Sequence, residues 1–242
     1  MNGPSAPEAA HERAAAYWNA PGTVAEFASL TPRPYLVELL AAFTGTEADP
    51  AGGTHGAGAP GDPGLALDLG CGGGRNTRAL LDHGFRVVAM DLHEAMVEAT
   101  RSAVAGYPAE RVTVRGGAAH AVPAESGTFA FVVCYGVLHN AVDVAQWRSC
   151  VTELARVLRP GGTLAFNCFT SDSLDPRLRP GGETGRHLLP DGVPMVLLPS
   201  EEIVDAFARA GLALAGPPHT YVRDLDVGPR AVLRCEFRKE VR

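Results

Sequence analysis

The feature that most constrains the fold is a glycine-rich turn placed directly after a short apolar run. The segment Leu67–Arg75 reads LDLGCGGGR, with Gly70, Gly72 and Gly74 at every second position. Glycine tolerates left-handed backbone angles, and its missing side chain lets a ligand come close to the main chain. The helix-like segment 76–83 follows, and a helix N-terminus offers unpaired N–H groups and partial positive charge. The pattern therefore predicts a strand, a ligand-binding turn and a helix in direct succession.

Apolar runs and helix-like segments continue to alternate after this turn. Strands are predicted over residues 65–69, 85–90, 111–115, 129–135 and 163–169, and helices over residues 76–83, 94–104, 144–158 and 200–210. This alternation is typical of a doubly wound α/β fold, in which helices cover both faces of a mostly parallel sheet. Two strand-like runs, residues 212–215 and 231–237, close the chain and are expected to pair as a hairpin across a polar connection.

Changes in composition divide the chain into three predicted regions. Residues 1–44 carry short helical stretches interrupted by prolines, and we interpret them as an N-terminal helical cap. Residues 45–64 are rich in glycine and proline and are typical of a flexible linker. Residues 65–242 form the predicted ligand-binding α/β domain, with a Pro/Gly-rich insertion on the substrate side at about 171–199.

Composition excludes several classes of partner. The 21 Lys and Arg residues are outnumbered by 27 Asp and Glu residues, giving a net charge of −6, which disfavours a nucleic-acid substrate. No uninterrupted apolar run approaches the ~18 residues that a membrane span requires, so we expect no membrane association. The five cysteines are odd in number and lack close pairs, which favours the reducing cytoplasm. The histidines and cysteines also lack the close spacing of a metal site, and no metal is predicted.

The glycine turn by itself is compatible with more than one class of ligand. A dinucleotide-binding turn needs a third glycine, but Arg75 and Thr77 stand where it would fall in the two possible registers. Asp91 ends the second predicted strand, 21 residues beyond Gly70, where a carboxylate can accept hydrogen bonds from both hydroxyls of a ribose. A nucleoside without a pyrophosphate is therefore favoured over NAD.

Three elements together resemble the class I S-adenosylmethionine-dependent methyltransferases of the small-molecule type. They are Leu67–Arg75, Asp91 and Glu153–Gly162, in this order, and the resemblance covers about residues 65–169. It implies a doubly wound, mostly parallel seven-stranded sheet whose last strand is antiparallel. It also implies S-adenosyl-L-methionine as cofactor and S-adenosyl-L-homocysteine as product.

The resemblance also implies a set of cofactor-binding residues: Tyr17, Asp68, Gly70, Cys71, Gly72, Asp91, Leu92, Met96, Gly117, Ala118 and Cys134. Asp68 would brace the glycine turn, Asp91 would hold the ribose and Leu92 would contact the adenine. Two acidic residues common in the family are absent, because Gly117 and Ala130 occupy their positions. Adenine recognition is then expected to rest on backbone groups of Gly117 and Ala118 or on other residues.

The residues for catalysis and acceptor binding are predicted from less specific patterns. His139 follows the fourth predicted strand and is the candidate general base, with packing or helix capping as the alternative role. The candidate substrate-binding residues are Trp18, Tyr135, Asn140, Arg186 and His187. An aromatic face from the cap would attract a sulfonium, although Tyr17 and Trp18 would equally fill the core of the cap.

The leading functional hypothesis is methyl transfer to oxygen, nitrogen, sulfur or carbon of a small molecule. The acidic charge and the bacterial-looking composition point to secondary metabolism, in a monomer or homodimer. Three alternatives stay open. The bound sulfonium would stabilise a rearrangement, cyclisation or decarboxylation without methyl transfer; the chain would be a non-catalytic cofactor-binding subunit; or it would be an NAD-dependent oxidoreductase.

Overall fold

The computed structural model describes residues 6–45, 62–225 and 228–241. Its helices are α1 (Ala6–Trp18), α2 (Pro21–Ser29), α3 (Pro34–Thr44), α4 (Arg75–Asp82), α5 (Glu94–Ala103), α6 (Val144–Val157) and α7 (Ser200–Arg209), with short 3-10 turns at Ala109–Arg111 and Leu138–Asn140. Most of the linker predicted over residues 45–64 lies outside the described residues, so the division into regions stays a prediction. Among the described residues, none of the helices is long and apolar enough to cross a lipid bilayer.

The described strands confirm the predicted fold class. They are β1 (Leu65–Leu69), β2 (Arg86–Asp91), β3 (Val112–Gly116), β4 (Phe129–Tyr135), β5 (Leu158–Phe169), β6 (Arg179–Pro180), β7 (Arg186–Leu188), β8 (Pro194–Val196), β9 (Leu212–Leu214), β10 (His219–Arg223) and β11 (Arg230–Lys239). The main sheet has the order β10-β11-β5-β4-β1-β2-β3, with β9 also paired to β11. Strands β1 to β5 run parallel, and the last strand, β11, is antiparallel to β5.

Two apolar layers hold helices against the faces of this sheet. Successive side chains of β4 point to opposite faces of the sheet, and all of them are buried. Strand β4 therefore contributes to both apolar layers. On one face Phe131 packs with Phe43 of α3 and Phe85, and the same layer includes leucines of α4. On the other face Phe166 packs against Phe207 of α7, in a layer that also holds Trp147 of α6. Burial on both faces explains why the central strands read as continuous apolar runs.

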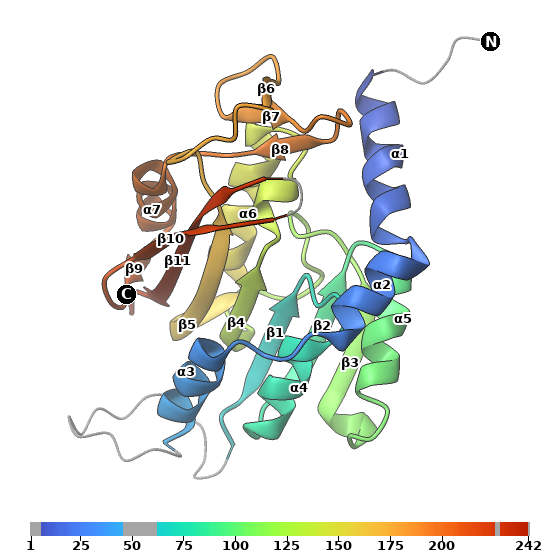
Figure 1. Ribbon diagram of the computed structural model, residues 1–242. Coiled ribbons are helices and arrows are strands. Elements are labelled where there is room, and N and C mark those ends of the chain that lie inside the picture. The colour runs from blue at the N-terminus through green and yellow to red at the C-terminus, as the bar shows by residue number, and fades with distance from the viewer. Residues whose placement is uncertain (1–5, 46–61, 226–227, 242) are drawn as a thin grey trace.

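The N-terminal helices begin at the prolines that interrupt the sequence pattern. Pro21 and Pro34 each stand at the first helical position of α2 and α3, where a missing N–H costs nothing. Helix α1 stands at the end of the molecule toward which the arrows of β1 and β4 point, and β6 to β8 lie at the same end (Figure 1). The carboxyl ends of the parallel strands therefore face both α1 and the insertion.

Two segments without predicted strands differ from expectation. The insertion at about residues 171–199 forms a small antiparallel sheet of β6, β7 and β8. The two closing runs pair as expected, through β9 and β11, but their polar connection contains a further strand, β10. All five residues of β10 are exposed, which is why the segment carries no apolar alternation.

Candidate cofactor and acceptor site

The turn between β1 and α4 has the backbone that its glycines predict. Gly70, Gly72 and Gly74 adopt φ angles of 75°, 55° and 81°, in the left-handed region that favours glycine. The N–H groups of Gly70 and Cys71 donate hydrogen bonds to the Met90 carbonyl oxygen, at 2.8 and 2.9 Å. A Cβ atom at Gly70 would lie 2.3 Å from a methyl carbon of Val137. The turn is thus tied to β2 and tightly covered by the segment after β4.

Asp91 connects the glycine turn to the segment after β2. Its Oδ2 accepts a hydrogen bond from the Gly72 N–H and its Oδ1 accepts one from the His93 N–H, both at 3.0 Å. The residue is 9 % exposed and lines a cavity above the turn. A carboxylate oxygen has two lone pairs, so each oxygen keeps acceptor capacity for a ligand hydroxyl.

Asp68 lies beneath the turn and does not line the cavity. Thr77 of α4 donates a hydrogen bond from its Oγ1 to Asp68 Oδ2, at 2.6 Å. Asp68 Oδ1 is buried and accepts no hydrogen bond from the described residues. Burial raises the pKa of Asp68 to about 6, although the Thr77 hydrogen bond opposes this shift. The contact with Thr77 agrees with the predicted bracing role, because it joins β1 to the helix after the turn.

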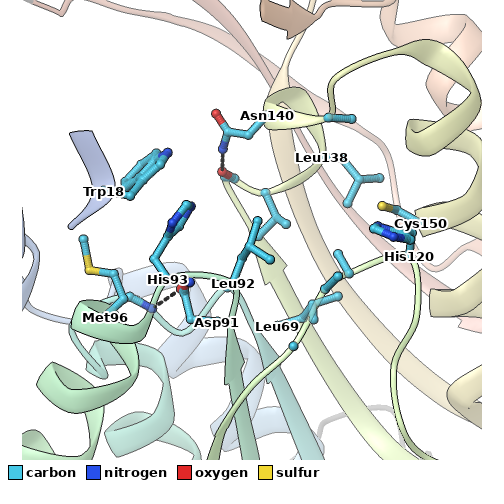
Figure 2. A pocket seen from close by; sticks show the side chains of 18 of the residues that line it. Trp18, Leu69, Asp91, Leu92, His93, Met96, His120, Leu138, Asn140 and Cys150 are labelled. Carbon is cyan, nitrogen blue, oxygen red and sulfur yellow. Dashed lines mark hydrogen bonds between the residues drawn. The ribbon is translucent and has the colours of Figure 1, made fainter. Parts of the chain in front are cut away.

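The cavity has a volume of about 160 Å³ and lies over the carboxyl ends of β1, β2 and β4. Figure 2 shows Trp18 and His93 on one side, His120 and Cys150 on the other, and Leu92 between them. The Trp18 and His93 rings stack with centroids 6.1 Å apart and planes at 23°. The last residue of α1 therefore closes one wall of the cavity.

This lining suits a nucleoside better than a charged phosphate ligand. Asp91 supplies paired carboxylate oxygens, which match a ribose diol and repel an anion. Beside it, Leu92, Met96, Leu138 and Ala119 form an apolar slot for a flat base. The N–H of Gly117 is already bound to the Asp91 carbonyl oxygen, so base recognition through that group is not open. The remaining donors and acceptors therefore have to come from other lining residues.

The structure brings most of the predicted site residues to this cavity. Those that line it are Trp18, Gly70, Gly72, Asp91, Leu92, Met96, Gly117, Ala118, Tyr135 and Asn140. Asn140 donates a hydrogen bond from Nδ2 to the Gly136 carbonyl oxygen at 2.9 Å, which orients its side chain beside the cavity (Figure 2).

Other predicted cofactor residues lie outside the lining. Tyr17 is 54 % exposed and packs its ring edge-on against Trp18, with centroids 5.0 Å apart. Cys71 is buried, where its Sγ accepts a hydrogen bond from Thr100 at 3.2 Å. Cys134 is fully buried within the sheet, and burial raises the pKa of its thiol. These side chains support the site from behind or beside it without contacting the cavity.

His139 does not reach the cavity either. Its side chain is 5 % exposed, and its Nδ1 accepts a hydrogen bond from the Phe169 N–H at 3.2 Å. The ring packs on Phe169 with centroids 4.2 Å apart, and burial lowers the pKa of His139 to about 3. A low pKa makes this imidazole a weak base, and its ring is enclosed away from the cavity. The placement argues against the general-base role and for the packing alternative.

The two predicted substrate residues of the insertion have structural contacts instead. Arg186 donates from Nε to the Val142 carbonyl oxygen at 2.8 Å, which fastens β7 to the segment after β4. The His187 ring contacts the Gly185 carbonyl oxygen through Nδ1 at 3.3 Å. Neither residue lines the cavity.

Sequence reasoning missed the remaining lining residues: Phe27, Leu69, His93, Ala119, His120, Gly136, Val137, Leu138, Ala141, Gln146 and Cys150. Phe27 comes from α2, and Gln146 and Cys150 come from α6. They are far apart along the chain, and no local pattern marks them. The position of His93, two residues after Asp91, was a usable signal, because residues that closely follow a strand end can face the same cavity.

Comparisons with known proteins agree with this geometry. The family model described as a methyltransferase domain matches residues 66–162. A malonyl-(acyl-carrier protein) O-methyltransferase of Enterobacter lignolyticus is 38 % identical over 118 residues, which cover 47 % of this chain and 41 % of that protein. A demethylmenaquinone methyltransferase of Clavibacter sepedonicus is 35 % identical over 115 residues, covering 48 % of this chain and 44 % of that protein. The matched part of the chain thus spans less than half the length of these relatives.

Solved structures extend the likeness in fold to the whole chain. A 1,6-didemethyltoxoflavin-N1-methyltransferase of Burkholderia thailandensis, with bound 1,6-didemethyltoxoflavin and S-adenosylhomocysteine, superposes with a TM-score of 0.64 at 18 % identity, covering 100 % of this chain and 94 % of that chain. An S-adenosylmethionine-dependent methyltransferase of Methanosarcina mazei gives 0.63 at 18 % identity, covering 74 % and 93 %. Residues 66–162 thus carry a methyltransferase domain similar to that of the class I S-adenosylmethionine-dependent methyltransferases, whose cofactor is S-adenosyl-L-methionine.

Proposed function

We propose that this chain transfers a methyl group from S-adenosylmethionine to oxygen, nitrogen, sulfur or carbon of a small molecule. The observation that carries the proposal is Asp91, whose two oxygens are fixed by the N–H groups of Gly72 and His93 at the edge of an apolar slot. Paired hydrogen-bond acceptors of this kind match the two hydroxyl donors of a free ribose. The membership of residues 66–162 in a methyltransferase family supports the same function.

Residues of this chain would bind the cofactor as follows. Asp91 accepts the ribose hydroxyls, and Leu92 and Met96 contact the base. The glycine turn leaves room for the amino-acid part close to the backbone of Gly72. When bound, the cofactor supplies an electrophilic methyl group on a sulfonium, and the Trp18 ring in the cavity wall would attract that positive charge.

Tyr135 and Asn140 are proposed to position the acceptor. Both line the cavity at the carboxyl end of β4 and just beyond it. Methyl transfer depends strongly on in-line positioning of the nucleophile, and such positioning supplies about 7–11 kcal/mol in well-oriented reactions. Since His139 is enclosed, the acceptor either carries a nucleophile that needs no protein base, such as a thiolate or a neutral nitrogen, or loses its proton to another lining residue, among which His93 and His120 are imidazoles.

The first experiment is calorimetric titration with S-adenosylmethionine, S-adenosylhomocysteine and NAD. Saturable binding of the first two and no binding of NAD is expected, since Arg75 and Thr77 stand where a dinucleotide-binding turn has its third glycine. Acceptor screening by product mass follows, where methyl transfer adds one CH₂ unit. Failure of both sulfur nucleosides to bind would reject the proposed function.

A second candidate is a cofactor-dependent reaction without methyl transfer. The 4+2 cyclase SpnF superposes with a TM-score of 0.62 at 14 % identity, covering 99 % of this chain and 97 % of that chain. The enclosure of His139 away from the cavity is compatible with such a reaction. Product mass separates the two, because a cyclisation leaves the mass of the substrate unchanged.

The cellular setting belongs to the same proposal. We place the enzyme in the cytoplasm, with a role in secondary metabolism and as a monomer or homodimer, on the strength of its charge, composition and cysteine usage. A small-molecule acceptor, rather than nucleic acid, fits the net charge of −6.

A further inference from the structure

Four arginines gather around Tyr35 at the start of α3. The guanidinium of Arg234, on β11, lies 4.1 Å above the centroid of the Tyr35 ring. Arg33 precedes this tyrosine by two residues, and its charge acts on the Tyr35 hydroxyl together with that of Arg234. Arg75 begins α4, and the charges of Arg33 and Arg223 add to burial in lowering the pKa of Arg75. The helix starts and the strand hairpin therefore concentrate positive charge in one place.

Sheet register explains how residues so far apart in sequence meet. Asn167 on β5 is opposite Arg234 on β11 and Tyr135 on β4, so the three side chains share one face of the sheet. Asn167 Nδ2 donates a hydrogen bond to the Tyr35 hydroxyl at 3.1 Å, which holds the start of α3 against that face. Arg223 on β10 lies on the same face, because its opposite residue in β11 is four positions from Arg234.

These arginines form no close ion pair among the described residues, although the charge of the Asp68 carboxylate acts on Arg75. Arg33, Arg75, Arg223 and Arg234 form no ion pair within 4.0 Å there, although the chain as a whole carries a net charge of −6. Glu236 lies two positions along β11 on the same face and does not pair with Arg234. Repulsion among like charges is relieved when an anion binds between them, and a guanidinium matches carboxylate and phosphate oxygens with paired N–H donors.

The cluster adjoins the cofactor cavity without being part of it. The Tyr35 and Tyr135 rings meet edge-on, with centroids 5.6 Å apart, and Tyr135 also lines the cavity. Strand β11 is three strands away from β1, or about 14 Å at the usual strand spacing. Arg223 and Arg234 therefore lie farther from the glycine turn than Arg75, and we assign these two to another molecule.

We propose that Arg33, Arg75, Arg223 and Arg234 form an anion subsite that binds a carboxylate or phosphate group of the methyl acceptor. The proposal rests on the proposed function, since it assigns the acceptor to a class: a small molecule with an acidic group away from the methylated atom. Tyr135 then forms the wall between the acidic group and the reacting end. Neutral analogues of the acceptor would lose this contact and bind more weakly.

The test measures anion binding on its own, before any acceptor is known. Malonate and inorganic phosphate are titrated into the cofactor-free protein by calorimetry and thermal shift, with dimethyl malonate as the neutral match. The variant Arg223→Gln/Arg234→Gln is compared with Arg209→Gln, which removes one exposed arginine from α7. We expect at least one anion to bind the wild-type protein and the Arg209→Gln protein equally. We expect the double variant to bind about tenfold more weakly or worse, the typical loss when a charge-assisted hydrogen bond is removed.

Several outcomes overturn the proposal. They are absence of binding by both anions to the wild-type protein, equal binding by the double variant, and equal binding of dimethyl malonate. Single substitution of Arg223, on the exposed strand β10, provides the test if the double variant does not fold. Whichever anion binds more tightly identifies the acidic group as a carboxylate or a phosphate.

Separate titrations with two cofactor analogues distinguish failure of the anion subsite from failure of the proposed function. S-adenosylhomocysteine and 5′-methylthioadenosine, which lacks the carboxylate, are titrated into the same variants. Unchanged affinity of the double variant for both supports an acceptor subsite. A loss confined to S-adenosylhomocysteine would assign the arginines to the cofactor carboxylate and refute the acceptor subsite. Failure of the wild-type protein to bind either nucleoside would reject the proposed function, whereas the anion titrations report on the cluster alone.

Discussion

Replacing Asp91 with alanine tests the central assignment of the cofactor site. The carboxylate accepts hydrogen bonds from the Gly72 and His93 N–H groups at 3.0 Å each and has free lone pairs at the cavity. The alanine variant removes both internal bonds and the proposed ribose contact. We therefore expect two effects, one on the free energy of unfolding and one on the affinity for S-adenosylhomocysteine.

The sizes of the two effects follow from the geometry. Both backbone donors are partly buried, so each lost bond costs about 1 kcal/mol and the free energy of unfolding falls by about 2 kcal/mol. The lost ribose contact lowers cofactor affinity by roughly 1–3 kcal/mol, or about 5- to 150-fold. The variant Asp91→Asn keeps one carbonyl acceptor and should lie between wild type and alanine in both measurements.

Calorimetric titration with S-adenosylhomocysteine and urea unfolding measure the two quantities on the same protein. The matched control is Glu94→Ala, which removes an exposed carboxylate three residues away that pairs with Arg101 outside the cavity. The control should bind the cofactor like wild type. A folded Asp91→Ala protein with wild-type affinity would refute the reasoning, because the ribose would then bind elsewhere.

Four further predictions concern neighbouring parts of the site. Gly70→Ala places a Cβ 2.3 Å from Val137 at a φ of 75°, so it should lower Tm and weaken S-adenosylhomocysteine binding; unchanged values would show that the turn is looser than described. The carboxyl of Asp68 has a folded pKa of about 6 against an ordinary 3.8, so the folded state holds its proton longer and wild-type stability should fall, relative to Asp68→Asn, by up to roughly 3 kcal/mol as pH rises from 4 to 6; a pH-independent difference in urea unfolding would contradict this. His139→Gln should lower the free energy of unfolding by about 1 kcal/mol through the Phe169 contact while leaving kcat for an identified acceptor nearly unchanged, and a large loss of kcat with wild-type folding would restore the general-base role. Trp18→Ala opens one cavity wall and should weaken S-adenosylmethionine binding more than binding of the uncharged S-adenosylhomocysteine, if the ring attracts the sulfonium.

Local patterns were enough to predict the central α/β elements and the cofactor turn. Strand β1 and helices α4 and α5 lie within one or two residues of the predicted bounds, because each has a strong apolar pattern bounded by glycine or a strand-end carboxylate. Strand β10 escaped prediction because an exposed edge strand is held by backbone pairing to β11 alone, and such pairing leaves no mark on side-chain polarity. The strands of the insertion are only two or three residues long, too short to show an alternation in the sequence.

The amino-acid sequence by itself determined the alternating strand and helix segments, the glycine turn and the position of Asp91 at the end of β2. These depend on contacts between neighbours in the chain, for which residue type and spacing are sufficient. Tertiary structure alone decided that His139 is enclosed against Phe169 and that Arg234 meets Tyr35 across the sheet face. Such placements depend on strand order and register between segments far apart in sequence. No local pattern encodes which side chain a distant strand will bring beside it.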